Sequence, residues 1–429
     1  MRRMPTIAAA ALCALCAWLG QIGCGTGREE QTVLSFWALG SEGDRVRGMV
    51  EEFERTHPGI SVALQQIPWT AAHEKLLTAY AGDATPDLCH LGNTWISEFV
   101  LLRALEPLDD RISRSDAIDR GDFFPGVLAS NMVDSLIYGI PWYVDTRVLF
   151  YRSDLLADVG YPNGPKTWDD VMTVCRALKS DRYKIRYPFF FPTNEWVPAV
   201  ILGVQYGSAL LRDEDMYGDF RGPEFRRGFD ALISFYQKGY TPVGMTEVLN
   251  RYHAFAEGYY AMYITGPWNI GEFQQRLPAK MQGRWMTAPL PTADSLYPGQ
   301  SLALGASLVL FRGSAHKEEA WKLIEFLSTK EHQLEFYKAT GNLPSRISAW
   351  EDKALVSNAY VGAFRRQLER VVPLPRVPEW EQIAMKLQYQ LELAAAGELS
   401  VDETLVSVDE AVDRILEKRR WVKRQAQEP

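Results

Sequence analysis

Apolar residues in the first part of the chain follow two spacings in turn. Residues 32–37 are mostly apolar, and a later run alternates apolar with polar positions, as a half-buried strand does: Ile60, Val62 and Leu64. Between them, apolar positions within residues 45–55 recur three and four apart, as on one face of a helix: Val46, Met49, Val50 and Phe53. The pattern therefore predicts a strand, a helix and a second strand.

The same order continues with a helix over residues 72–81 and a strand over residues 87–91. Strands that alternate with helices predict a parallel sheet covered by helices on both faces. Ligands of such sheets bind beyond the carboxyl ends of the strands. Residues 37–44 and 92–95 are therefore expected at the mouth of a pocket.

A second unit is predicted after the turn formed by Gly139 and Pro141. Its expected strands are residues 148–151, 187–191 and 261–265, and its expected helices include one capped at Thr167 and others over residues 226–239 and 245–258. A loop over residues 266–268 is expected to present Trp268. Residues 285–291 are interpreted as a return crossover, and residues 308–311 as a further strand that follows a loop of small residues over 305–307. Two more helices are expected to be capped, by Ser314 and by Ser400 with Glu403.

The chain has 429 residues, which exceeds the usual size of a single core. We expect an α/β protein of two doubly wound lobes joined by crossover hinge segments near Asp145, Pro289 and Pro344. The predicted division is residues 1–23 as a signal peptide, 24–31 as a tether, 32–144 with 290–344 as the first lobe, and 145–289 with 345–429 as the second.

The N-terminus has the organisation of an export signal. Arg2 and Arg3 precede an apolar stretch over residues 7–19. Gly23, Cys24 and Gly25 then resemble the cleavage box of a bacterial lipoprotein, with Cys24 as the lipidated residue and Gln21 where an aliphatic residue is usual. An unlipidated signal peptide or an uncleaved anchor is the alternative. The expected location is outside the cytoplasm, anchored to the cell membrane or periplasmic.

The net charge of −8 argues against nucleic acid as a partner. A basic cluster over residues 418–424 is interpreted as the solvated end of a helix. Of the five cysteines, Cys89 and Cys175 follow the signal region in apolar contexts and are expected to be buried thiols. The sequence has neither metal-ligand spacing nor a nucleotide-binding fingerprint, so no metal or cofactor is expected.

Four segments carry a resemblance to a known family. They are EEFERTHPGISV from residue 51, ATPDLCHLGNTWISEF from residue 84, GIPWYVDTRVLFYRSDLL from residue 139 and FAEGYYAMYITGPW from residue 255. They resemble the extracellular solute-binding proteins of bacterial ABC importers, in the sugar-binding branch typified by maltose-binding and trehalose/maltose-binding proteins. The resemblance implies a monomer that closes on a carbohydrate and delivers it to a membrane permease.

The resemblance also implies a set of ligand-binding residues. Carboxylates accept hydrogen bonds from sugar hydroxyls, and flat aromatic rings stack on the apolar faces of sugars. The implied residues are Glu42, Asn93, Trp95, Tyr143, Asp145, Glu195, Trp196, Trp268 and Arg376. The sequence departs from the trehalose/maltose branch at Gly92, Ser307 and Leu374. Trp168, Trp285 and Trp321 are interpreted as core residues.

Two other functions remain compatible with the sequence. A binding protein for an anionic solute such as a glycerol phosphate needs converging cations, whereas the implied pocket is acidic. A secreted glycosidase needs two carboxylates that meet in space, as Glu42, Asp145 and Glu195 could. In the family these positions bind hydroxyls, so we expect a binding protein and not an enzyme.

Overall fold

The computed structural model of the chain describes residues 31–244, 250–293 and 298–427. The predicted signal peptide, Cys24 and most of the predicted tether lie outside these residues, as do the first five residues of the helix predicted from residue 245. Among the described residues, no helix combines the length and apolar character needed to cross a bilayer.

Within the described residues, one sheet has six strands in the order β15-β6-β14-β3-β1-β2. β1 pairs in parallel with β2 and β3, which confirms the predicted arrangement, while β14 runs antiparallel to β3 and β6. The strand bounds are β1 Thr32–Leu39, β2 Ile60–Ile67, β3 Leu88–Gly92, β6 Ile140–Asp145, β14 Leu304–Leu310 and β15 Leu343–Pro344.

The second sheet has four strands among the described residues, in the order β12-β7-β11-β8. β11 is parallel to β8 and antiparallel to β7. Its strands are β7 Val148–Tyr151, β8 Tyr187–Phe190, β11 Tyr260–Thr265 and β12 Met286–Ala288. Short pairs complete the set: β4 Met132–Val133 with β5 Leu136–Ile137, β9 Leu211–Arg212 with β10 Tyr217–Gly218, and β13 Ser301–Leu302 with β16 Val371–Val372.

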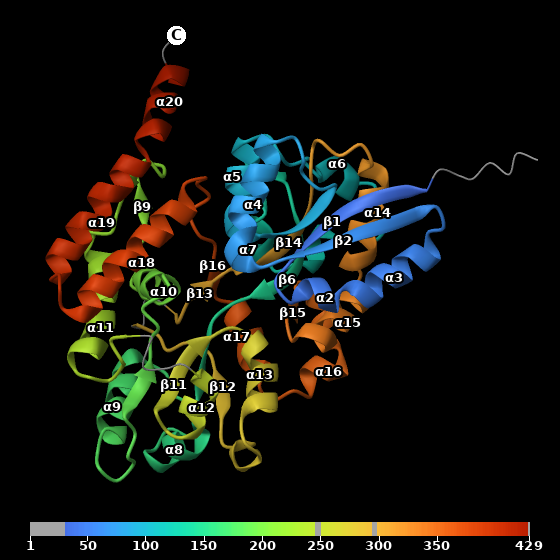
Figure 1. Cartoon of the computed structure of the whole chain (residues 1–429). Helices are drawn as coiled ribbons and strands as arrows, with labels where there is room; N and C mark the ends of the chain where they lie inside the picture. The colour runs from blue at the N-terminus through green and yellow to red at the C-terminus, as the bar shows by residue number, and fades with distance from the viewer. Residues whose placement is uncertain (1–30, 245–249, 294–297, 428–429) are drawn as a thin grey trace, which may run out of the picture.

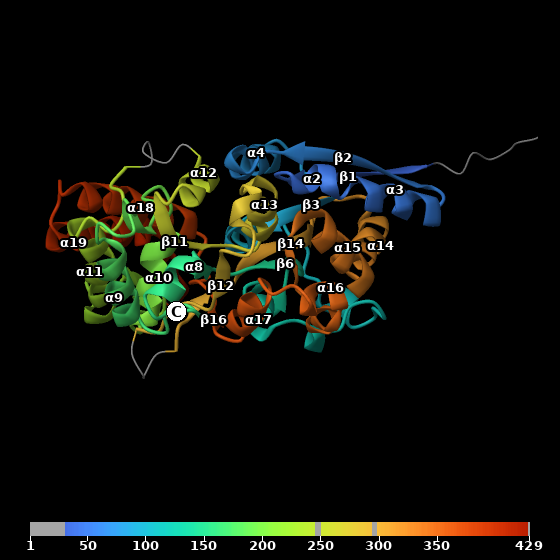
Figure 2. The ribbon, with the colours of Figure 1, turned by 90° about the horizontal axis from the view of Figure 1, so that it is seen from below.

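Helices cover both sheets, which lie in opposite halves of an elongated molecule (Figures 1 and 2). Around the first sheet they are α2 Glu42–Arg45, α3 Arg47–Thr56, α4 Trp69–Ala81, α5 Ile96–Leu101, α6 Asp109–Ile112, α7 Pro125–Ala129, α14 Lys317–Ser328 and α15 Lys330–Thr340. The others are α8 Ser153–Asp158, α9 Trp168–Leu178, α10 Val197–Gln205, α11 Pro223–Gln237, α12 Arg251–Ala256, α13 Trp268–Arg276, α16 Lys353–Val356, α17 Gly362–Leu368, α18 Trp380–Ala396, α19 Val401–Ile415 and α20 Glu417–Gln427.

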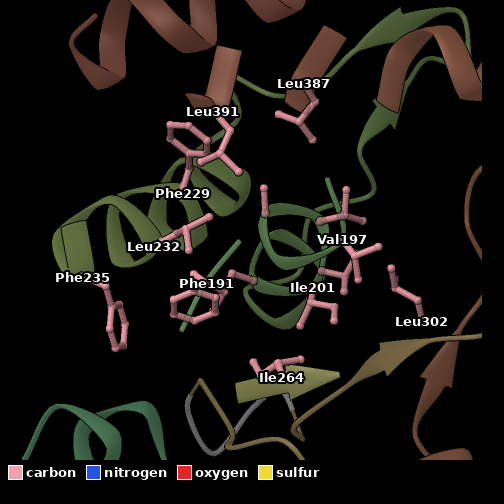
Figure 3. Packing of buried hydrophobic residues seen from close by; sticks show 14 of the residues in the cluster. Phe191, Val197, Ile201, Phe229, Leu232, Phe235, Ile264, Leu302, Leu387 and Leu391 are labelled. Carbon is pink, nitrogen blue, oxygen red and sulfur yellow. The ribbon is translucent and has the colours of Figure 1, made fainter. Parts of the chain in front are cut away.

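The core of the second half forms where helices from distant parts of the chain meet (Figure 3). Phe229 and Leu232 of α11 pack with Val197 and Ile201 of α10, and α18, from the last fifth of the chain, adds two leucines: Leu387 and Leu391. Leu302, which was predicted to belong to the first lobe, packs in this same cluster. The division into lobes, with its crossover near Pro289, stays a prediction.

The tryptophans interpreted as core residues are buried. Trp168, Trp285 and Trp321 are 5%, 0% and 7% exposed. Trp285 stacks between Phe150 and Tyr360, whose ring centroids lie 5.8 and 3.8 Å away. Their role is therefore packing. Cys89 and Cys175 are buried free thiols, as expected.

Several predicted helix starts are confirmed and others are corrected. Thr167 with Asp170 and Ser400 with Glu403 form capping boxes. Ser314 does not cap α14, because its hydroxyl accepts the N–H of His316, the residue before the helix. The helix predicted over residues 45–55 is confirmed as α3, while Arg45 ends the preceding helix α2.

Trp268 does not lie on a loop, as the sequence predicted. It is the first residue of α13, and Pro267 is the N-cap. The fixed φ of proline suits a helix start, so the Gly-Pro pair begins a helix directly after the strand.

Candidate functional site

A cavity of about 660 Å³ lies where the two halves of the molecule meet. Its first wall follows the carboxyl ends of β1 and β3, and includes Glu42 and Trp95. Its floor is the crossing from β6 to β7, and its second wall comes from the loop before α10 and the start of α13. The described lining residues include Ser41, Glu42, Trp69, Gly92–Trp95, Tyr143, Asp145, Arg147, Asn194–Val197, Tyr252, Trp268, Glu272, Leu304, Gly305, Thr340, Asn342, Glu381 and Gln388.

The structure brings eight of the nine residues implied by the resemblance to this cavity: Glu42, Asn93, Trp95, Tyr143, Asp145, Glu195, Trp196 and Trp268. Arg376 does not line this cavity, but it borders a smaller neighbouring pocket together with Asn93 and Thr94. Its guanidinium donates to the carbonyl oxygen of Met132 at 3.2 Å. Leu374 and Val377 occupy the buried positions of this segment, so Arg376 is turned outward.

Gly40 allows two cavity groups to approach the end of β1. Its φ of +66° is in the left-handed region, and a Cβ there would lie 2.5 Å from Oε2 of Glu42 and 2.5 Å from Cδ1 of Trp69. A glycine at this turn therefore leaves the space that the carboxylate and the indole occupy.

Glu42 is held by groups from two other segments. Its Oε1 accepts hydrogen bonds from the hydroxyl of Tyr143 at 3.3 Å and from Nδ2 of Asn342 at 3.2 Å. The carboxylate thus enters the cavity with one oxygen committed to the protein. Asn342 follows α15 and was not predicted to contribute.

Asp145 has a different environment. Its Oδ2 lies 3.6 Å from Nη2 of Arg147, while its Oδ1 is buried and has no hydrogen-bond partner in the protein. Burial raises the pKa of Asp145 to about 6, the cation of Arg147 lowers it, and the charge of Glu195 raises it. The carboxylate therefore lies at the floor of the cavity, with Oδ2 beside Arg147 and Oδ1 enclosed by the protein without a donor.

Arg147 is a lining residue that the sequence analysis missed. Its guanidinium lies 4.6 Å from the ring centroid of Trp268, and its Nε is buried without a hydrogen-bond partner. The Arg147 guanidinium therefore interacts with the charge of Asp145 and also makes a cation–π contact with the indole of Trp268. Its position in the sequence, two residues after Asp145, could have indicated that it lines the same cavity.

The aromatic groups of the cavity differ in how firmly they are packed. Trp95 is 9% exposed and packs at 5.6 Å against Trp69. Trp196 meets Trp380 edge-on at 5.7 Å. Trp69 was also missed, although it follows the carboxyl end of β2, where the strand rule places ligands.

Asn93 lines the cavity, but its amide is already engaged within the protein. Nδ2 donates to Oγ of Ser130 at 2.9 Å, and Oδ1 accepts from Oγ of Ser307 at 2.8 Å. The side chain therefore ties the loop after β3 to β14 and α7.

Further lining groups come from distant helices. Tyr252 donates to Oδ1 of Asn269 at 3.0 Å, and burial raises its pKa to about 12. Glu381 and Gln388 project from α18, which closes the cavity from the C-terminal part of the chain. Among the described lining residues, five carboxylates face a single arginine: Glu42, Asp145, Glu195, Glu272 and Glu381.

A group of metal-competent side chains lies away from the cavity, on α3 and α15. Donor atoms of Glu52, His332 and Glu335 lie within 4.8 Å of one another. None of these three residues lines the cavity. The cavity is lined by hydrogen-bond acceptors, chiefly carboxylates, and by aromatic rings.

The comparisons with known proteins agree with this architecture. The profile of a family described as bacterial extracellular solute-binding protein matches residues 48–361. The structure of the sugar-binding protein MalE from Xanthomonas citri is 46% identical, with a TM-score of 0.87 over 92% of this chain and 100% of that chain.

Two relatives characterised by their ligands are more distant. The diacetylchitobiose binding protein DasA of Streptomyces coelicolor is 24% identical over 82% of this chain and 81% of its own. The maltodextrin-binding protein MdxE of Bacillus subtilis is 25% identical over 68% of this chain and 69% of its own.

Proposed function

This chain belongs to the bacterial extracellular solute-binding protein family, and we propose that it is the binding component of an ABC importer for a di- or oligosaccharide. The ligand would occupy the cavity between the two halves. The sugar-binding name of the Xanthomonas citri protein, at 46% identity, supports the carbohydrate class.

The observation that carries the proposal is that carboxylates and indoles line one cavity, Glu42, Asp145 and Glu195 among the carboxylates. A hydrogen bond from a ligand hydroxyl to such a carboxylate contributes about 1.5–3 kcal/mol. Sugars combine such hydroxyls with apolar C–H faces, and those faces suit the rings of Trp268 and Trp196. A carbohydrate therefore satisfies both features of the cavity at once.

The charges of the cavity argue against an anionic solute. Arg147 lies 3.6 Å from Asp145 and stacks on Trp268, so its charge is partly compensated before any ligand binds. Phosphate recognition uses converging cations, whereas the other charged lining groups are carboxylates. A glycerol phosphate would be repelled.

The size of the cavity supports more than one sugar ring. A volume of about 660 Å³ lies in the middle of the range for small-molecule sites, roughly 300–1,000 Å³. Its indoles lie on both walls, with Trp69 on the first and Trp196 and Trp268 on the second.

The test is a thermal-shift screen followed by calorimetric titration. The panel contains maltose, maltotetraose, trehalose, N,N′-diacetylchitobiose and glycerol 3-phosphate. We expect at least one sugar to raise the melting temperature and glycerol 3-phosphate to leave it unchanged. A panel without any stabilising sugar would refute the proposal, and the release of new reducing ends would indicate a hydrolase instead.

We also propose that the mature chain is exported, anchored through Cys24, and monomeric. This rests on the signal pattern and the family, since Cys24 lies outside the described residues. Labelling with a fatty acid should modify the wild type but not Cys24→Ala. Equal labelling of both would contradict the anchor.

A further inference from the structure

A fully buried histidine lies directly behind the cavity, without lining it. His90 is 0% exposed in β3, and its ring meets the rings of Trp69, Trp142 and Tyr143 at 5.2, 5.1 and 5.4 Å. The function proposed above gives this polar group no role.

The hydrogen bonds of His90 determine which ring nitrogen carries the proton. The backbone N–H of Leu39 donates to Nδ1 at 3.2 Å. An amide nitrogen can only donate, so Nδ1 is the unprotonated nitrogen. Burial lowers the pKa of His90 to about 3, so the ring is neutral and its single proton is on Nε2.

This assignment fixes the direction of the next two bonds. Nε2 of His90 lies 3.0 Å from the hydroxyl oxygen of Tyr143, so the imidazole donates and the phenol accepts. The phenol proton is then available only to another partner, and Oε1 of Glu42 lies 3.3 Å away. Burial, together with the charges of Glu42 and Asp145, raises the pKa of Tyr143 well above its usual value, so the phenol keeps its proton.

A one-way chain of hydrogen bonds therefore runs from the end of β1 to the cavity, through Leu39, His90, Tyr143 and Glu42. We infer that His90 is a positioning residue for ligand binding: it orients the Tyr143 hydroxyl towards Glu42 and so holds the Glu42 carboxylate in place for the ligand. The inference rests on the proposed function, because it assigns a role in carbohydrate binding.

The chain has two physical effects. A donor to the phenol oxygen strengthens the bond that the phenol in turn donates, because hydrogen bonds in a chain polarise one another. It also commits Oε1 of Glu42, which accepts from Asn342 as well, and so leaves Oε2 as the oxygen available to a ligand. Both effects depend on the proton at Nε2.

Two substitutions separate the two nitrogens of His90. His90→Asn keeps an acceptor near Nδ1 for Leu39 but removes the donor to Tyr143. His90→Gln places an amide near Nε2 and restores a donor to Tyr143. We expect His90→Asn to weaken the affinity for the tightest sugar of the panel about three- to tenfold, the effect of one lost hydrogen bond. His90→Gln should stay within about twofold of the wild type.

A double-mutant cycle distinguishes positioning from folding. Tyr143→Phe removes the hydroxyl through which His90 acts, so adding His90→Asn to it should change affinity by less than about twofold. An effect of His90→Asn that persists in the Tyr143→Phe background would overturn the inference, as would wild-type affinity in His90→Asn. Titrations are corrected for the folded fraction measured by circular dichroism.

The tautomer is tested without any ligand. Nitrogen-15 NMR of labelled histidine, with His90→Asn to assign the signal, should show protonated Nε2 and unprotonated Nδ1. A protonated Nδ1 would overturn the inference even if sugars bind. Conversely, a wild type that binds none of the panel sugars refutes the proposed function, while the spectrum still reports whether the chain of bonds exists.

Discussion

Trp268 is the residue for which the binding and packing interpretations differ most. It lies at the cavity, half-buried, with Arg147 over its ring. An indole that stacks on a sugar removes apolar area of both partners from water. Trp268→Ala should therefore weaken sugar affinity by roughly 10- to 150-fold, which corresponds to about 1.5–3 kcal/mol.

The melting curve of the unliganded variant is the control. Because Trp268 is absent from the buried clusters, its truncation should change stability little. Calorimetric titration of Trp268→Ala with the sugar, together with that melting curve, distinguishes a binding role from a packing role. Unchanged affinity with a strongly lowered melting temperature would make Trp268 a packing residue.

Asp145 predicts a dependence of stability on pH. Its pKa is raised to about 6 in the folded protein, from an ordinary value near 3.8. A raised pKa means that the folded state binds the proton more tightly than the unfolded state does. The contribution of this proton to the free energy of unfolding is fully present below about pH 4 and is lost as pH rises through about 6. The free energy of unfolding of the wild type should therefore fall, relative to Asp145→Asn, between about pH 4 and 6.

Urea denaturation of the unliganded proteins at several pH values measures this difference. Asp145→Asn removes the titrating group and keeps a side chain of similar size, so it is the matched reference. If the difference in unfolding free energy is constant from pH 4 to 7, the burial of Asp145 does not raise its pKa.

At the scale of elements, the capping box that the sequence predicts at the start of α9 should stabilise the second half of the molecule. The hydroxyl oxygen of Thr167 accepts a hydrogen bond from the backbone N–H of Asp170. The Asp170 carboxylate in turn accepts one from the backbone N–H of Thr167. Thr167→Ala should lower the free energy of unfolding by about 1 kcal/mol.

Thr173→Ala on the same helix is the control, because Thr173 is exposed and bonds only along its own helix. Chemical denaturation of both variants provides the comparison. Equal losses of stability would show that the cap is not the cause.

The elements also show where sequence reasoning succeeded and where it could not. Glu42 and Asn93 lie within three residues after a strand and Asp145 ends one, so local patterns were sufficient to place them near the cavity. Trp69 was missed because α4 begins three residues earlier than its apolar spacing indicated.

Other contributions depend on packing between distant segments. Glu381 and Gln388 reach the cavity only because Leu387 and Leu391 of α18 pack into the core of the second half. Arg376 does not line the cavity, because Leu374 and Val377 take the buried positions beside it. The spacing of residues along the chain does not indicate how such distant segments pack together.

For the whole molecule, the cavity has walls on both halves, so a ligand that touches both favours their approach. Glu42 and Trp69 belong to the first wall, and Trp196 and Trp268 to the second. Small-angle scattering should show the radius of gyration falling when a bound sugar is added. The Trp268→Ala variant at the same sugar concentration is the control, and an unchanged wild-type profile at saturation would argue against closure.

The strand order of the first sheet has a consequence for the synthesis of the protein. β14 lies between β3 and β6, yet it is residues 304–310 of the chain, more than 150 residues after β6 ends at Asp145. Until it emerges from the ribosome, β3 and β6 lack their shared neighbour, and such unpaired edges are templates for aggregation. The four strands of the second sheet, by contrast, all come from residues 148–288. The strands of the second sheet can therefore pair before β14 is made, whereas the first sheet keeps unpaired strand edges until then.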